Sequence, residues 1–136
     1  MNNLAAVVQA QGRYREAETL NQRALEGWEK KLGEDHPDTL MSVNNLATVL
    51  QAQGKYGEAE TLNWRALEGC EKKLGEGHPD TLRSVSNLAA VLRVQGKYGV
   101  AETLNRRALE GCEKELGEGH PDTLASVNNL ATVLQA

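Results

Sequence analysis

Three histidines are the residues whose type most readily suggests metal chemistry. His36, His78 and His120 lie 42 residues apart, each within the same His-Pro-Asp triplet. A zinc site needs further histidine, cysteine or carboxylate ligands at close spacing, and no second ligand lies at such a spacing here. We therefore predict no metal site and expect each imidazole to cap or pack at the start of a helix.

The other reactive residue types form no catalytic arrangement. The carboxylates are numerous, but no distinctive pair could serve as general acid and general base. The sequence has no GxSxG motif, no phosphate-binding loop, and no Ser–His arrangement apart from repeated structural positions. We predict a protein that is not an enzyme and that uses no cofactor.

Two cysteines could in principle carry redox chemistry. Cys70 and Cys112 lie 42 residues apart, and Trp28 stands 42 residues before Cys70. The three residues therefore occupy equivalent positions in a 42-residue repeat. In a stack, equivalent helices have another helix between them, and adjacent axes lie about 8–10 Å apart. A disulfide needs Cα atoms within about 7 Å. We therefore expect both thiols to be free and to serve in packing.

A repeat of 42 residues positions all of these side chains. Residues 45–86 and 87–128 differ at only eight positions. A period of about 20 to 50 residues indicates stacked units that share a core between neighbours. We predict one repeat array over residues 1–136, with repeats at 3–44, 45–86 and 87–128 and a partial helix at 129–136. Such an array offers a long surface for binding rather than an enclosed catalytic cavity.

Each repeat contains two amphipathic helices, which we name helix A and helix B. In residues 37–53, helix A begins with a proline suited to the first helical turn and with Asp38, which complements the helix dipole. Gly54 ends it, and helix B follows at residues 56–74 after a very short turn. Both helices carry apolar side chains at three- and four-residue spacing: Leu40, Val43, Leu46, Ala47, Leu50, Ala59, Leu62, Ala66, Leu67 and Cys70.

This pattern resembles the tetratricopeptide repeat. The large and small pair Leu46-Ala47, the turn residues Gly54 and Tyr56, and Ala59 and Ala66 of helix B match that family. Val43 and Asn63 depart from it, since the family often has larger apolar residues at these two positions. The 42-residue period and the sequence pattern QGKYxEAExLxxRALE…LGExHPDTL resemble those of the kinesin light chain subclass.

The resemblance implies an all-α fold, a right-handed α-solenoid of stacked antiparallel helix pairs. We expect seven helices, at residues 2–11, 14–32, 37–53, 56–74, 79–95, 98–116 and 121–135. Because the chain starts and stops inside helix A, we expect it to be a segment of a longer array.

Composition narrows the classes of partner. The net charge is −4, and acidic and basic residues are interleaved, so no face is built for nucleic acid phosphates. No apolar run approaches the ~20 residues of a membrane span, and the N-terminus lacks the features of a signal peptide. We expect a cytoplasmic protein whose partner is another protein or peptide.

Variation between the repeats marks one side of helix A. The changing positions include Met41, Asn44, Thr48 and Gln51, with Arg83 and Arg93 in the next repeat. In tetratricopeptide arrays this side lines the concave groove that binds peptides, and the two arginines favour an acidic segment or a C-terminal carboxylate. The alternative is drift at exposed positions without function.

An asparagine recurs without change beside these positions. Asn3, Asn45, Asn87 and Asn129 could hold the backbone of an extended peptide, because an amide both donates and accepts hydrogen bonds. The resemblance supports this role, and capping or packing between helices is the alternative. We predict an interaction scaffold that binds partner peptides in the concave groove, within a larger adaptor or sensor protein.

The last helix suggests a second function. Leu124, Val127, Leu130 and Leu134 form an apolar stripe that no helix B follows. Uncapped repeat ends are apolar surfaces, and such patches mark association sites. The alternative prediction is therefore an array that self-assembles through its ends, either head to tail or tail to tail.

Overall fold

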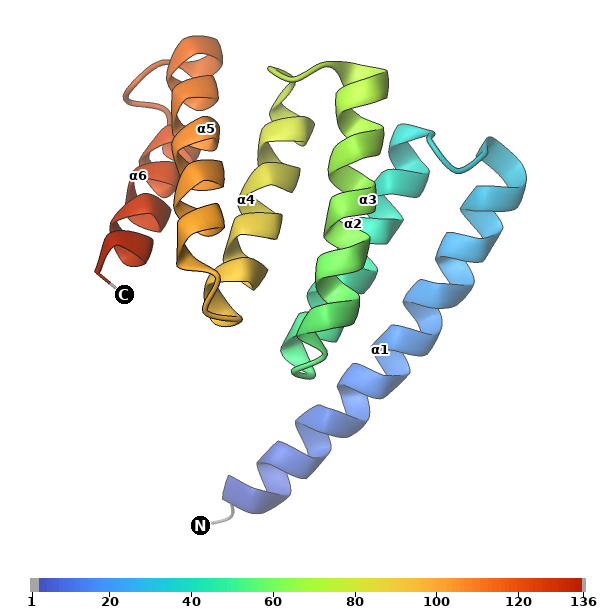
Figure 1. The fold of residues 1–136 in the computed structure, drawn as a ribbon. Coiled ribbons are helices and arrows are strands. Elements are labelled where there is room, and N and C mark those ends of the chain that lie inside the picture. The colour runs from blue at the N-terminus through green and yellow to red at the C-terminus, as the bar shows by residue number, and fades with distance from the viewer. Residues whose placement is uncertain (1–2, 136) are drawn as a thin grey trace.

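The computed structural model describes the backbone of residues 3–135 and the side chains of residues 12–135. In this part the secondary structure consists of six α-helices: α1 (Asn3–Leu32), α2 (Pro37–Ala52), α3 (Tyr56–Leu74), α4 (Pro79–Val94), α5 (Tyr98–Leu116) and α6 (Pro121–Leu134). Each helix packs against the next one along the chain, and α2, α4 and α6 also contact each other in turn. Figure 1 shows the resulting α-solenoid, in which the start of α1 projects beyond the other helices.

The histidines cap the A helices, as predicted. The backbone N–H of Asp80 donates to Nδ1 of His78 at 3.0 Å, and the same bond forms at the starts of α2 and α6. A proline occupies the first turn of each of these helices. This arrangement satisfies one of the four N–H groups that a helix start leaves without a partner.

The A–B turns depend on a left-handed glycine. Gly54 has φ +81° and Gly96 has φ +84°. At the first of these turns, the N–H of Gly54 donates to the Gln51 carbonyl and that of Lys55 donates to the Leu50 carbonyl. This pair of bonds is the Schellman motif, which favours glycine because that residue tolerates positive φ. The turn reverses the chain and makes helices A and B antiparallel.

The prediction of two separate helices at residues 2–11 and 14–32 was wrong. Residues 3–32 form one continuous helix, and Gly12 is helical within it. An A–B turn is maintained by the packing of helix A on helix B, in which Leu40 and Val43 are buried. Residues 3–11 have no counterparts of this apolar pair. An unbroken helix instead keeps its backbone hydrogen bonds across Gly12, so the described part has six helices rather than seven.

Within a repeat, a glycine of helix B lets the two helices approach closely. A Cβ atom placed on Gly69 would lie 2.6 Å from Cδ2 of Leu40, and one on Gly111 would lie 2.5 Å from Cδ2 of Leu82. Both leucines are buried. Each leucine of helix A therefore fills the space that the absent side chain leaves on helix B.

Candidate functional site

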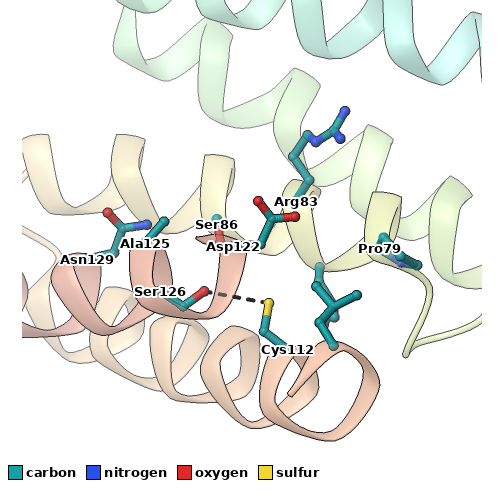
Figure 2. A pocket seen from close by; sticks show the side chains of 10 residues that line it. Pro79, Arg83, Ser86, Cys112, Asp122, Ala125, Ser126 and Asn129 are labelled. Carbon is teal, nitrogen blue, oxygen red and sulfur yellow. Dashed lines mark hydrogen bonds between the residues drawn. The ribbon is translucent and has the colours of Figure 1, made fainter. Parts of the chain in front are cut away.

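Two adjoining cavities lie between the A helices α4 and α6. The first has a volume of 160 Å³ and the second 100 Å³, and Ser86 and Asn129 line both. We name them together the α4–α6 groove. Its other lining residues are Pro79, Leu82, Arg83, Ala90, Arg93, Asn105, Cys112, Leu116, Asp122, Ala125, Ser126 and Thr132. Figure 2 shows the first cavity.

The positions that vary between repeats determine how open this groove is. The same cavity recurs one repeat earlier, between α2 and α4, but its volume is only 20 Å³. There Arg83 occupies the phase at which the first cavity has Ala125, and Asn44 stands where the first cavity has Ser86. The shorter side chains of alanine and serine leave space that arginine and asparagine take up. Near-identical repeats therefore carry sites of different size.

The groove has two arginines that are free to bind an anion. Arg83 is exposed and Arg93 is half-buried, and within the described residues neither forms an ion pair. Asp122 supplies the one carboxylate among the lining residues, and Figure 2 shows it beside the opening near Arg83. The groove therefore has a net positive charge on a protein whose overall charge is −4.

A buried thiol closes the floor of the first cavity. Cys112 is buried, and its Sγ accepts a hydrogen bond of 3.7 Å from Ser126 Oγ. Cys70 lies 3.7 Å from Ser84 Oγ in the preceding repeat, and burial raises its pKa. Both cysteines are free and buried, as predicted. A buried thiol packs as a small apolar group and is a poor nucleophile.

The structure brings several predicted groove residues together. Arg83, Arg93 and Asn129 line the α4–α6 groove. Met41 and Asn44 line the smaller cavity beside Arg83, where Asn44 Nδ2 donates to Ser84 Oγ at 3.2 Å. Asn44 therefore joins α2 to α4 and is partly engaged in packing.

The other predicted residues are more scattered. Asn45 and Thr48 are exposed, while Asn87 and Gln51 are half-buried. The Thr48 hydroxyl donates to the carbonyl of Asn44 in its own helix. The side chain of Asn3 lies outside the described residues.

Sequence reasoning missed part of the groove lining. Asp122 has counterparts at Asp38 and Asp80, and this recurrence is explained by the helix N-terminus alone. The sequence therefore gave no reason to place Asp122 at the cavity. Ser86 and Ala125 belong to the varying positions of helix A, and that variation was the signal that could have identified them. Asn105 comes from a helix B and departs from the family pattern at the same phase as Asn63, which was a further signal.

Metal-binding groups and membrane-spanning helices are absent from the described residues. They contain no group of three or more residues that could hold a metal ion. No helix in residues 3–135 is long and apolar enough to cross a membrane. We take the α4–α6 groove as the candidate site because its lining carries two arginines that form no ion pair within the described residues.

Comparison with known proteins identifies the repeat. The tetratricopeptide repeat model matches residues 1–72, 40–111 and 82–136, which together cover the chain. No curated protein matches the sequence.

Solved structures of kinesin light chain-like repeats are similar to the chain. Nearly identical TPR-like repeats from a Podosopora anserina protein assigned as a kinesin light chain have 31% identity and a TM-score of 0.85, over 98% of this chain and 64% of that one. A single-site variant of those repeats has 30% identity and a TM-score of 0.84, over 97% and 62%. BtubC (BKLC) from P. vanneervenii has 26% identity and a TM-score of 0.81, over 97% and 52%.

The chain therefore spans less than two thirds of each of these three structures. The 42-residue period and the family model extend along the whole chain, and α2 to α5 form the helix pairs of the repeat. The chain belongs to the tetratricopeptide repeat family.

Proposed function

We propose that this chain binds acidic segments of partner proteins as extended peptides in the α4–α6 groove. Tetratricopeptide repeats generally mediate protein–protein interaction, and the fold is typically a non-catalytic scaffold. The observation that carries the proposal is the pair of adjoining cavities between α4 and α6, with two arginines that have no ion-pair partner in the described residues.

The dimensions of the groove suit a short extended segment. Arg83 and Arg93 lie ten residues apart on α4, a distance of about 15 Å along the helix axis. An extended peptide of about five residues covers the same length. A ligand with carboxylates near both ends of such a segment can therefore reach both guanidinium groups.

The chemistry of the lining supports the same ligand. A guanidinium binds a carboxylate through two parallel hydrogen bonds, and the amide of Asn129 can both donate to and accept from a peptide backbone. Leu82 and Leu116 line the first cavity and offer an apolar surface to a side chain of the ligand. We place this function in the cytoplasm, within a larger adaptor or sensor protein, because the buried free cysteines suit a reducing compartment.

Fluorescence anisotropy tests the proposal. The probes are a labelled pool of decapeptides with Asp or Glu at two positions five residues apart, and a matched pool with Lys at those positions. We expect the acidic pool to bind and the basic pool not to bind. Equal binding of both pools, or no binding of the acidic pool, overturns the proposal.

Two variants locate the binding site. Arg83→Ala combined with Arg93→Ala is expected to weaken binding by roughly tenfold or more, since each lost charged hydrogen bond costs about 1.5–3 kcal/mol. Arg106→Ala is the matched control, because Arg106 lies on a helix B and already pairs with Glu102.

Ala125→Met fills the first cavity without a change of charge. The first repeat already has Met41 at this phase, so the fold tolerates the residue. Weaker binding by Ala125→Met with an unchanged Arg106→Ala variant supports the groove. Wild-type affinity in both groove variants would assign the binding to another surface.

A further inference from the structure

A buried amide lines the second cavity of the α4–α6 groove. Asn105 is 3% exposed, and within the described residues its side chain forms no hydrogen bond. It is the amide among the buried residues of α5, which otherwise are Ala101, Leu104, Ala108 and Cys112. Because buried polar groups are nearly always hydrogen-bonded, an amide in this state indicates a ligand or a water molecule that completes it.

The second cavity offers that amide together with a single charge. Among the described residues that line this cavity, Arg93 is the ionisable one, because Asp122 lines only the first cavity. The Thr132 hydroxyl already donates to the carbonyl of Asn128 in its own helix. A carboxylate accepts hydrogen bonds at both oxygens and carries the opposite charge, so it is the end group that this lining fits best.

Arg93 and Asn105 lie at different depths of the cavity. Arg93 is half-buried on α4, whereas Asn105 is almost fully buried on α5, which packs against both α4 and α6. A side chain that enters between α4 and α6 therefore meets the guanidinium before it reaches the amide. The cavity has a volume of 100 Å³, and a water-sized group needs only about 10–15 Å³, so the end of a side chain fits inside.

We propose that this cavity is a subsite for a glutamate side chain of the bound peptide, and that Asn105 selects glutamate over aspartate. The subsite rests on the proposed function, the binding of acidic segments in the α4–α6 groove. The Arg93 guanidinium binds the carboxylate, and the amide of Asn105 donates a further hydrogen bond to it from the floor. An aspartate carboxylate is one methylene closer to the peptide backbone, so it pairs with Arg93 without reaching Asn105.

The preceding repeat lacks this combination of residues. Asn63 lies 42 residues before Asn105 and is 2% exposed, so its side chain is equally buried. Gln51, however, stands 42 residues before Arg93 and brings no positive charge for a carboxylate. Asn63 therefore provides a control that matches Asn105 in residue type, in helix position and in burial.

Two peptide pools test the selection of glutamate. One labelled decapeptide pool carries Glu at both acidic positions, five residues apart, and the other carries Asp at both. In fluorescence anisotropy we expect the wild-type chain to bind the Glu pool at least about fivefold more tightly than the Asp pool, because only glutamate gains the hydrogen bond from Asn105.

Two alanine variants test whether the Asn105 amide is the selecting group. Asn105→Ala removes the amide without filling the cavity, and alanine is a good helix former. We expect this variant to bind the Glu pool about as weakly as it binds the Asp pool, so that the preference disappears. Asn63→Ala removes an equally buried amide from the preceding repeat and is expected to keep the preference of the wild type. Circular dichroism of both variants checks that the helices are retained.

The possible results distinguish the subsite from the proposed function. If neither pool binds to the wild-type chain, the proposed function fails and the subsite fails with it. If both pools bind with equal affinity, acidic peptides do bind but the glutamate subsite is wrong. A preference for Glu that survives in Asn105→Ala shows that another group selects the side chain. Loss of the preference in Asn63→Ala as well assigns the effect to altered helix packing and overturns the role of Asn105.

Discussion

The close approach of helices A and B makes the same substitution act oppositely at two equivalent positions. Gly27 and Gly69 occupy one phase of successive B helices. A Cβ at Gly27 meets nothing within 4 Å, whereas a Cβ at Gly69 lies 2.6 and 2.8 Å from the two methyl carbons of Leu40. We therefore compare Gly27→Ala with Gly69→Ala.

The magnitudes follow from two opposing terms. Replacing glycine by alanine inside a helix stabilises it by about 1 kcal/mol, and both variants gain this. At Gly69 the Leu40 side chain must also withdraw by about 1 Å to reach ordinary carbon–carbon distances. Leu40 is buried, so this overpacking costs about 1–3 kcal/mol. We expect Gly27→Ala to raise the free energy of unfolding by about 1 kcal/mol. The free energy of unfolding of Gly69→Ala should be about 1–3 kcal/mol lower than that of Gly27→Ala.

Urea unfolding followed by circular dichroism measures the difference. Midpoints of the unfolding transitions are compared at equal slope. In a Leu40→Ala background the crowding is gone, so Gly69→Ala is expected to become stabilising, and the coupling of the pair isolates the contact. If Gly69→Ala stabilises the wild type as much as Gly27→Ala does, the proposed close packing is refuted.

Four further outcomes are expected. His78→Ala removes the acceptor for the Asp80 N–H and should lower the free energy of unfolding by about 1 kcal/mol, whereas His78→Asn should retain most of it. Burial raises the pKa of Cys70, so at high pH the native state keeps the thiol proton that the unfolded chain has lost. The free energy of unfolding should therefore fall as the pH rises above the ordinary thiol pKa. Urea titrations at several pH values measure this dependence, and Cys70→Ala should flatten it. Lys97→Ala breaks the exposed pair with Glu60 and should cost less than about 1 kcal/mol; a larger loss would mean that ion pairs between successive B helices stabilise the stack. A thiol reagent should modify Cys70 and Cys112 slowly in the native protein and rapidly in urea, and fast native labelling would contradict their burial.

Local patterns were sufficient to predict most of the helices. The spans of α3 and α5 match the predicted residues 56–74 and 98–116, and α2, α4 and α6 end one residue earlier than predicted. The reason is that periodicity, the His-Pro-Asp starts and the Gly54-type turns act within a few residues of chain. The candidate groove was predicted only in part, because lining residues such as Asp122 carry no signal that separates them from their copies in other repeats.

What the sequence by itself determined is the repeat: its period, its helix pairs, its capping residues and its free, buried thiols. The tertiary structure alone decided what identical local sequences do in different places. Gly12 and Gly54 both follow the residues Ala-Gln and precede a basic residue and a tyrosine, yet only Gly54 takes the left-handed turn. Gly54 follows a helix A whose Leu40 and Val43 are buried, whereas residues 3–11 carry no counterparts of these two side chains. The tertiary structure also decided that Ala125 borders a 160 Å³ cavity and Arg83 a 20 Å³ cavity, because each cavity forms between helices of successive repeats.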